Sequence, residues 1–252
     1  MRCQPPPADL AELGARAAAL VGASLADLAH GLGGELGADP VRTKGHAGEL
    51  LEHLLGATGG PTAVHDFPHL GVELKTVPVT PLGRPRESTF VCLIPLLAAG
   101  DVPWADSRVR RKLAHVLFVP LVAPSRVGTR RASPDGFHRG RAWEPFQGSH
   151  ISGAGLGDRR VGPPLFWRPT PVQERALKDD YDDLMGLVGV GGIEEVSGHA
   201  GRILQVRPKA ASSRCRAFAP GPEGEWLATV PRGFYLRARF VAALLRDPTA
   251  LP

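Results

Sequence analysis

Apolar residues recur at the spacing of amphipathic helices in five parts of the chain. In the first part, Leu10, Leu13 and Ala17 are three and four positions apart, which places them on one helical face. Asp9 and Glu12 have the spacing of a capping box at the start of this helix. The five helices are expected to cover about residues 10–21, 24–30, 46–55, 170–188 and 237–246.

Other parts of the chain have the patterns of β-strands. Within residues 72–77, one set of side chains alternates with another, and this period of two predicts a half-buried strand. The two sets are Val72, Leu74 and Thr76, and Glu73, Lys75 and Val77. Residues 88–97 and 115–122 are almost continuously apolar, which predicts buried strands, and the first of them is expected to be central in its sheet. Further along, a turn at residues 199–201 is expected to lead into the second strand of a hairpin, at residues 202–207.

The strand at residues 72–77 carries candidate catalytic groups. Its period of two puts Glu73 and Lys75 on the same face. A turn around Phe67-Pro68 and Gly71 is expected to fold the chain back, so that Asp66 lies near Glu73. Carboxylate oxygens hold Mg²⁺, which polarises a phosphodiester and lowers the pKa of a bound water. An adjacent lysine can orient or deprotonate that water, or offset the charge of the transition state.

The same pattern has a purely structural interpretation, which is a surface strand with a Glu-x-Lys charge pair. An Asp followed, after a gap of any length, by Glu-x-Lys also occurs by chance in a chain of this length. Lysine usage favours a catalytic role, because only five of the 30 basic residues are lysines and Lys75 is one of them. Where arginine is the usual base, a retained lysine indicates a need for a compact ammonium with a tunable pKa.

Composition excludes several classes of protein. A chain of 252 residues that is 43% hydrophobic can form one large domain or two lobes. It has no apolar run of membrane-spanning length, and acidic residues stand where a signal peptide carries positive charge. The three cysteines and nine histidines show no zinc-ligand spacing. We therefore expect a cytoplasmic protein without zinc and without a membrane partner.

The net charge of +5 is concentrated in one part of the chain. Between residues 124 and 160, seven arginines stand against three acidic residues, which accounts for +4 of the total. Because the rest of the chain is nearly neutral, the overall charge says little about DNA binding by the core. Residues 124–158 are also rich in Gly, Pro and Ser and have no periodicity, so they are expected to be a mobile surface insertion.

Six blocks of the sequence resemble, in the same order, the MutH family of DNA mismatch repair endonucleases. The longest, DFPHLGVELKTVPVTPLGRPRESTFVCLIP, contains Asp66, Glu73 and Lys75. The blocks cover most of the chain outside residues 124–158, where members of the family have a shorter loop. They are Lys44–Gly56, Asp66–Pro95, Ser107–Pro120, Arg159–Trp167, Leu204–Ala211 and Val230–Leu236.

The resemblance implies a fold and a division of the chain. The fold would be α/β and restriction-endonuclease-like, with a mixed central sheet flanked by helices and two lobes that form a DNA-binding cleft. The chain would be a single MutH-like endonuclease domain, acting as a monomer. Its catalytic lobe would cover about residues 1–123, the insertion about 124–158 and the DNA-reading lobe about 159–252.

The resemblance also implies the residues of an active site. Asp66 and Glu73 would hold one or two Mg²⁺ ions, for which Mn²⁺ can substitute, and the Leu74 carbonyl would be a third protein ligand. Glu52 would serve a second ion or its waters. Three lysines would complete the site: Lys75 orients the attacking water, Lys112 stabilises the pentavalent phosphate, and Lys44 lies near the DNA backbone.

In the same way, two C-terminal segments are implied to read bases. Arg207-Pro208-Lys209 and residues 231–235 are expected to be short polar and aromatic loops that enter the DNA grooves at GATC. Arginine suits the edge of guanine, and Tyr235 would pack against the adenine whose methylation is sensed. The implied reaction is nicking of the unmethylated strand at hemimethylated GATC during methyl-directed mismatch repair, activated by MutL, which is itself loaded through MutS.

Two other interpretations stay open on the sequence. A stand-alone restriction endonuclease of the same superfamily would cut GATC in both strands without a partner protein. A non-catalytic DNA-binding module would keep the DNA contacts with a decayed active site. The complete set of carboxylates and lysines argues against the second interpretation, and metal titration would test it.

Overall fold

The structure is a computed structural model that describes residues 4–33, 45–60, 65–98, 102–124, 155–196, 198–210 and 214–252. The chain forms two compact units that alternate along the sequence. The first unit consists of Met1–Leu70, Leu74–Arg86 and Leu117–Phe166, and the second of Gly71–Glu73, Glu87–Val116 and Trp167–Pro252. Lys44 and most of the expected insertion lie outside the described residues. The lobe boundaries expected near residues 123 and 159 stay predictions.

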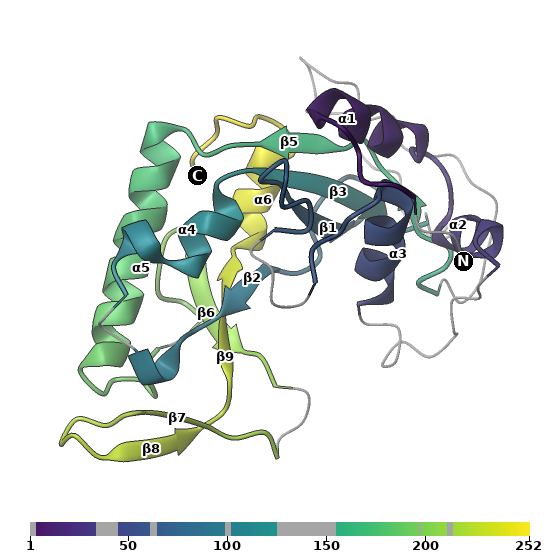
Figure 1. Ribbon diagram of the computed structural model, residues 1–252. Coiled ribbons are helices and arrows are strands. Elements are labelled where there is room, and N and C mark those ends of the chain that lie inside the picture. The colour runs from purple at the N-terminus through teal and green to yellow at the C-terminus, as the bar shows by residue number, and fades with distance from the viewer. Residues whose placement is uncertain are drawn as a thin grey trace, which may run out of the picture. The chain divides into compact units, whose positions relative to one another are not determined.

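A four-stranded sheet lies mainly in the first unit (Figure 1). Its order is β1-β3-β4 and β5 also pairs with β3, so β3 is the strand with the most neighbours. All seven residues of β3 are buried, which confirms the buried strand predicted at residues 115–122. The strands are β1 (Glu73–Val79), β3 (Val116–Val122), β4 (Arg160–Val161) and β5 (Leu165–Trp167).

Three helices of the first unit confirm the predictions for residues 10–55, and capping side chains fix where the first two begin. The Asp9 side chain accepts a hydrogen bond from the Glu12 N–H at 2.8 Å, and the Ser24 hydroxyl accepts one from the Asp27 N–H at 3.1 Å. The capping box at the first helix is incomplete, since the Glu12 carboxylate accepts from the N–H of Ala8 rather than of Asp9. The helices are α1 (Leu10–Ala19), α2 (Leu25–Gly31) and α3 (His46–Leu55).

The strand predicted at residues 72–77 is present as β1, but its half-buried alternation is wrong. Glu73 and Val77 are buried, although the alternation puts them on the face opposite the buried Leu74. Thr76, on the same face as Leu74, is only half-buried. β1 therefore has buried side chains on both faces, and a strand covered on both faces does not show a simple alternation.

The second unit contains a three-stranded antiparallel sheet with a long helix on one face (Figure 1). The sheet has the order β2-β9-β6, and α5 packs on it through Tyr181, whose ring centroid lies 5.5 Å from that of Phe234. The apolar stripe of the helix predicted at residues 170–188 is buried, and Thr170 and Gln173 complete a capping box. The stripe consists of Leu177, Tyr181, Leu184 and Val188. The elements of this sheet and helix are β2 (Thr89–Leu93), β6 (Leu204–Pro208), β9 (Arg232–Leu236) and α5 (Pro171–Gly189).

Smaller elements complete the second unit. Two 3₁₀ turns and α4 lie between β2 and β3 in the sequence, a two-stranded hairpin lies between β6 and β9, and α6 confirms the helix predicted at the C-terminal end. No helix in the described part of the chain is both long enough and apolar enough to cross a membrane. These elements are η1 (Leu96–Ala98), η2 (Trp104–Asp106), α4 (Arg108–Leu113), β7 (Ala217–Pro220), β8 (Trp226–Thr229) and α6 (Ala238–Leu244).

Two strand predictions for the second unit are wrong. The apolar run at residues 88–97 is not a central strand, because only Thr89–Leu93 is extended and β2 is at one edge of its sheet. The chain then enters η1, and Leu93 is 51% exposed. The second strand of the expected hairpin is present as β6, but it pairs with β9 and not with the segment before the turn at residues 199–201.

The two segments expected to be polar loops, Arg207–Lys209 and residues 231–235, are also assigned wrongly. Most of their residues lie in β6 and β9, which pair with each other and place Arg207 opposite Gly233. Arg207 and Tyr235 lie on one face of these strands, whereas Arg232 shares the other face with the buried Val206 and Phe234. An open sheet face therefore explains only part of the polarity of the two segments.

Asp180 of α5 fixes the chain where it enters β6. Its buried carboxylate accepts hydrogen bonds from three consecutive backbone N–H groups, of Arg202 at 2.6 Å and of Ile203 and Leu204 at 2.7 Å. A buried carboxylate is tolerated only when its oxygens are satisfied in this way. The contact ties the helix to the sheet edge and sets the position of β6.

We expect Asp180→Ala to lower the free energy of unfolding by roughly 2–4 kcal/mol, because three buried N–H groups lose their acceptor. Urea denaturation measures the change. Asp183→Ala, at an exposed position of the same helix, is the matched control and should change stability by less than about 0.5 kcal/mol. Equal effects of the two substitutions would show that the Asp180 contact is not structural.

Candidate functional site

Asp66 is held in place by a glycine loop and by the start of β1, within the first unit. Its backbone carbonyl accepts hydrogen bonds from the N–H groups of Thr58 and Gly59, at 3.0 and 2.9 Å. A Cβ at Gly59 would lie 2.1 Å from the carbonyl oxygen of His65, so only glycine fits there. The side-chain Oδ2 of Asp66 accepts from the N–H of Leu74 at 2.7 Å. The Asp66 carboxylate therefore binds the peptide that follows Glu73 in the sequence.

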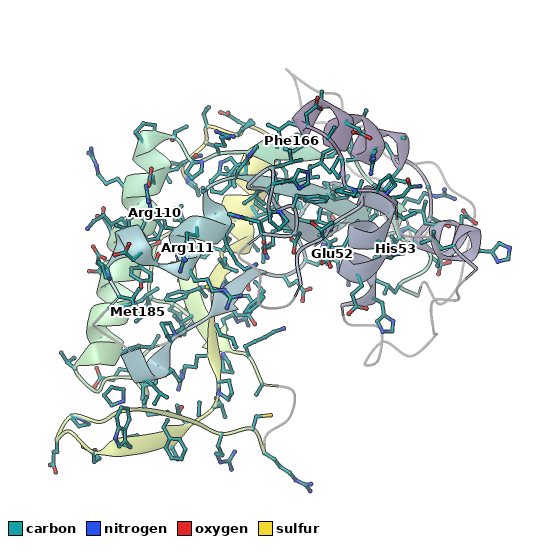
Figure 2. All side chains as sticks on the ribbon, in the orientation of Figure 1. Glu52, His53, Arg110, Arg111, Phe166 and Met185 are labelled. Atoms are coloured by element: carbon teal, nitrogen blue, oxygen red, sulfur yellow. The ribbon has the colours of Figure 1, made fainter. Side chains whose placement is uncertain are left out.

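The other predicted residues of the first unit lie on two elements. Lys75 follows Leu74 on β1, and Glu52 is on α3, where Figure 2 labels it beside His53. Both side chains are half-buried. The first unit thus contains one carboxylate bound to the backbone of β1, a lysine on the same strand and a second carboxylate on a helix.

The second unit contains a buried ion pair between Glu73 and Lys112. The Nζ atom of Lys112 lies 2.6 Å from Oε1 of Glu73, and the two side chains are 12% and 2% exposed. The Glu73 N–H also donates to the carbonyl of His115, just before β3, at 3.0 Å. The desolvation of each charge is offset by its partner, and removing one partner of such a pair typically costs about 3–5 kcal/mol. The Glu73 side chain is therefore fixed by charge as well as by its strand.

The basic cluster at residues 108–112 does not act as one patch. It forms α4, which begins at the Ser107 cap, and its Val109 is buried. Arg110, labelled in Figure 2, pairs with Glu174 at 3.0 Å, and its side chain is 47% exposed. Because successive helical positions point in different directions, Lys112 turns inward to Glu73 while Arg110 stays at the surface.

The oxygen donors of the predicted metal site suit a hard cation. In the described part of the chain, no three His, Cys, Asp or Glu side chains gather closely enough to hold a metal by themselves. Mg²⁺ does not need such a group, because it usually binds one or two carboxylates and completes its shell with water and substrate phosphate. The carboxylates of Asp66 and Glu73, with the carbonyl of Leu74, have the chemistry that this ion prefers.

Four of the side chains around β2, β9 and β6 form an aromatic and cationic face of the second unit, opposite the face that α5 covers. Phe90 and Tyr235 are paired across β2 and β9, with ring centroids 5.3 Å apart at an angle of 64°. The ammonium of Lys209 lies over the Phe90 ring, 4.8 Å from its centroid. We call this set, which consists of Phe90, Arg207, Lys209 and Tyr235, the cationic face.

The cationic face brings together residues that the sequence left on separate segments. Arg207, Lys209 and Tyr235 were singled out by resemblance, whereas Phe90 was hidden in an apolar run and was missed. The strand register provides the link, because Tyr235 lies opposite both Phe90 and Gln205. Phe90 and its neighbour Val91 are both apolar, so no local sequence pattern marked Phe90, and only the structure shows Val91 buried and Phe90 half-buried.

The environment of Tyr235 keeps its phenol protonated. Burial raises the pKa of Tyr235 above its usual value, the positive charge of Arg207 lowers it and the negative charge of Glu87 raises it. Because the net direction is upward, the hydroxyl is neutral throughout the physiological pH range. Tyr235 therefore offers a neutral ring and a hydrogen-bond donor next to the arginine.

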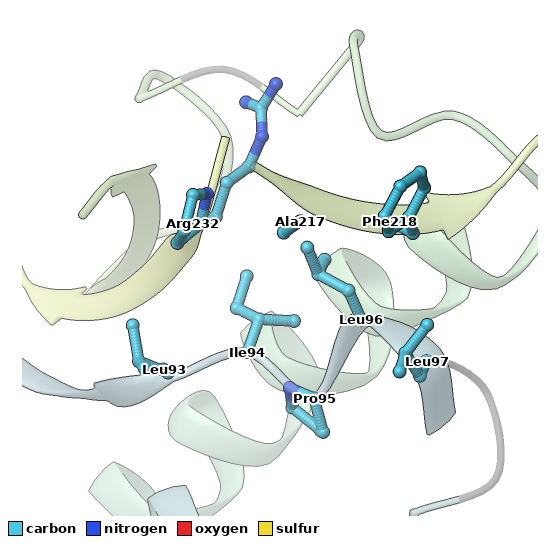
Figure 3. Close-up of a pocket in the computed structure, with 9 residues that line it drawn as sticks. Leu93, Ile94, Pro95, Leu96, Leu97, Ala217, Phe218 and Arg232 are labelled. Atoms are coloured by element: carbon cyan, nitrogen blue, oxygen red, sulfur yellow. The ribbon is translucent and has the colours of Figure 1, made fainter. Parts of the chain in front are cut away.

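An apolar hollow of about 450 Å³ also lies in the second unit (Figure 3). Two of its lining residues, Leu97 and Phe218, are 69% and 52% exposed. Its lining contains one charged residue, Arg232, and no carboxylate, histidine or cysteine, so it has no groups for hydrolysis. The lining residues are Leu93, Ile94, Pro95, Leu96, Leu97, Ala217, Phe218, Pro231 and Arg232.

The fold and the groups at the start of β1 define a class of protein. A mixed α/β architecture with helices around its sheets, in which Asp66 binds the Leu74 peptide and Glu73 pairs with Lys112, is restriction-endonuclease-like. This confirms the α/β, restriction-endonuclease-like class expected from the sequence, whereas the DNA-binding cleft between two lobes stays a prediction.

Comparison with known proteins identifies the family within this class. A family model described as "DNA mismatch repair enzyme MutH" matches residues 55–132. The DNA mismatch repair protein MutH of Serratia proteamaculans is 39% identical over 96% of this chain and 94% of its own length. The MutH proteins of Haemophilus influenzae and Salmonella paratyphi C are 40% and 42% identical, each over 95% of this chain and over 96% and 92% of their own lengths. The chain belongs to the MutH family of DNA mismatch repair enzymes.

We expect Gly233→Ala to disturb the cationic face. A Cβ at this position would lie 2.7 Å from Cε2 of Phe90 and 3.1 Å from the Cys92 carbonyl oxygen, so the ring must move. The expected loss is about 1–3 kcal/mol in the free energy of unfolding, measured by urea denaturation.

A double-mutant cycle with Phe90→Ala provides the control for this prediction. If the ring is the obstacle, the Gly233 substitution should be nearly neutral once Phe90 is truncated. A loss of the same size in both backgrounds would assign the effect to the backbone at Cys92.

Proposed function

We propose that the chain is a Mg²⁺-dependent DNA endonuclease that nicks the unmethylated strand at hemimethylated GATC sites in methyl-directed mismatch repair. The observation that carries the proposal is the buried Glu73–Lys112 pair. Cutting a phosphodiester requires a fixed carboxylate that can hold a metal and a nearby cation that offsets the negative charge of the transition state. Membership of the MutH family supports the role in repair.

The metal-holding part of the proposal assigns four residues. Asp66 and Glu73 would hold Mg²⁺, or Mn²⁺ in its place, through their carboxylates, and Leu74 through its carbonyl. Glu52 would serve a second ion or position its waters. When bound, the ion would polarise the scissile phosphate and lower the pKa of a bound water.

The two lysines of the site would have different tasks. Lys75, half-buried on β1, would orient the attacking water for displacement of the leaving oxygen. Lys112 would stabilise the charge of the pentavalent phosphate. Its contact with Glu73 supports this assignment, because an ammonium beside a metal-holding carboxylate is close to the phosphate that the carboxylate serves.

The cationic face would read the DNA sequence. Arg207 would contact guanine edges, Lys209 and the backbone at Pro208 would fix the approach to the bases, and Tyr235 would pack against adenine. Arginine donors match the O6 and N7 acceptors of guanine in the major groove. Lys44 would contact the backbone, and such phosphate contacts should make binding fall steeply as salt rises.

The proposed partners follow from the reaction. The substrate would be double-stranded DNA with an unmethylated or hemimethylated GATC site, and the chain would act on it as a monomer in the cytoplasm. MutL would activate cleavage, and MutS would act indirectly by loading MutL.

We expect Glu73→Ala to abolish cleavage, with a loss of at least about 10²–10³-fold, and to retain DNA binding. Because Glu73→Ala leaves the Lys112 charge buried without its partner, Glu73→Gln should be measured beside it. The amide keeps the shape and a hydrogen bond to Lys112 but is a poor metal ligand. Glu174→Gln removes an exposed carboxylate and is the matched control, with cleavage unchanged.

The measurements for this prediction are Mg²⁺-dependent nicking and DNA binding in a gel-shift assay. Loss of both cleavage and binding in Glu73→Gln would contradict a role as metal ligand alone. Full cleavage by Glu73→Gln would remove Glu73 from the active site.

A second experiment tests the reaction itself. We expect nicking to occur only on unmethylated strands when unmethylated, hemimethylated and fully methylated GATC duplexes are compared, and to rise when MutL is added. Double-strand cutting without MutL would instead identify a stand-alone restriction enzyme. Retained binding without cleavage in any condition would identify a non-catalytic DNA-binding module.

A further inference from the structure

Ser88 makes a hydrogen bond that connects the two edges of the β2-β9-β6 sheet. It lies directly before β2, and its Oγ accepts from Nη1 of Arg207 at 2.9 Å. Arg207 is on β6, and β9 lies between the two strands. The Arg207 side chain therefore crosses the middle strand of the sheet to reach Ser88.

The path of the arginine passes Tyr235. This residue is on β9, opposite Gln205 of β6 and Phe90 of β2. The charge of Arg207 acts on the Tyr235 phenol, which shows that the guanidinium is close to it. The arginine is thus held between two edge strands, next to the tyrosine of the cationic face.

An anchored arginine is better prepared to recognise a base than a mobile one. Its five N–H groups form a rigid planar fork, and reading guanine needs that plane at a defined angle to the base edge. A surface arginine loses rotamer freedom when it binds, and a hydrogen bond made beforehand removes part of that cost. One N–H group suffices for the anchor, so the remaining groups are left for the base.

The neutral hydroxyl of Ser88 suits this purpose. A carboxylate at the same place would form an ion pair with Arg207 and would repel DNA phosphates. A hydroxyl contributes a modest hydrogen bond and no charge, so the arginine can adjust when the base arrives. Glu87, the preceding residue, supplies the carboxylate of this region, and its charge acts on Tyr235.

We propose that Ser88 is a positioning residue for base recognition, which holds the Arg207 guanidinium across β9 in the orientation that reads guanine. The inference rests on the proposed function, in which Arg207 recognises guanine at GATC. Ser88 acts through Arg207 and does not itself contact the reacting phosphate.

The test compares variants on two duplexes, one with guanine at GATC and one with 7-deazaguanine, which lacks the N7 acceptor that arginine uses. We expect Ser88→Ala to lower kcat/KM on the guanine duplex roughly three- to tenfold, mainly through a higher KM. On the 7-deazaguanine duplex the loss should be less than about twofold, because the contact that Ser88 prepares is already missing. Ser88→Thr, which keeps the hydroxyl, should restore the wild-type values.

Two controls separate this role from a general effect on the fold. Thr249→Ala removes an exposed hydroxyl that bonds only within its own turn, to Asp247, and should behave as wild type on both duplexes. The urea midpoint of Ser88→Ala should equal that of the wild type, because the Ser88–Arg207 contact is at the surface.

The outcomes distinguish the inference from the function on which it rests. Equal losses on the two duplexes, or no loss on either, would overturn the role of Ser88 while wild-type nicking at GATC still supported the proposed function. A wild-type protein that does not nick GATC would overturn both.

Discussion

The buried charge of Glu73 is the constraint on which the candidate site depends. A carboxylate that is 2% exposed is stable only with a partner, and that partner is Lys112, which is 39 positions away in the sequence. The pair fixes the first residue of β1 relative to α4, so the helix is part of the site although it carries no predicted metal ligand. Asp66 depends on the same strand in another way, because its carboxylate binds the N–H of Leu74. Glu73 is thus held by the charge of a side chain, and Asp66 is held by the backbone N–H of the residue that follows Glu73.

In the β2-β9-β6 sheet of the second unit, contacts on one face determine the positions of side chains on the other. On one face, Phe234 packs against α5, and Asp180 of that helix holds the entry to β6 through three backbone N–H groups. These buried contacts set the strand register. On the other face, the register alone aligns Phe90 with Tyr235, and only side-chain contacts at the surface refine their positions. The helix-covered face therefore determines where the cationic face presents its rings and charges, without touching them.

Local interactions explain what could be predicted from the sequence. The helix at residues 46–55 was predicted within its observed bounds, and the starts of α1, α2 and α5 follow from capping residues within three positions. Contacts between distant segments explain the errors. Nothing near Arg207 indicates that Gly233 lies opposite it, so the end of β6 and most of β9 were taken for loops. Similarly, the pattern at residues 72–77 places Glu73 but cannot show its burial, which depends on Lys112. Glu52, Lys44 and Lys112 were assigned to the site only by resemblance to a family, and these assignments stay predictions.

The contacts that hold the two sets of proposed site residues differ in strength, and the difference matches the tasks proposed for them. A metal-holding carboxylate must not move between turnovers, since a displacement of about 1 Å can cost two orders of magnitude in rate. The buried ion pair with Lys112, whose loss would cost about 3–5 kcal/mol, holds Glu73 in one position, as the proposed metal-holding role requires. A base-reading arginine must instead exchange partners, from protein or water to guanine, each time DNA binds. An exposed hydrogen bond to a neutral serine, worth about 1 kcal/mol, orients Arg207 without competing with the base. Strong buried contacts for the chemistry and weak exposed contacts for recognition are therefore what the two tasks require on physical grounds.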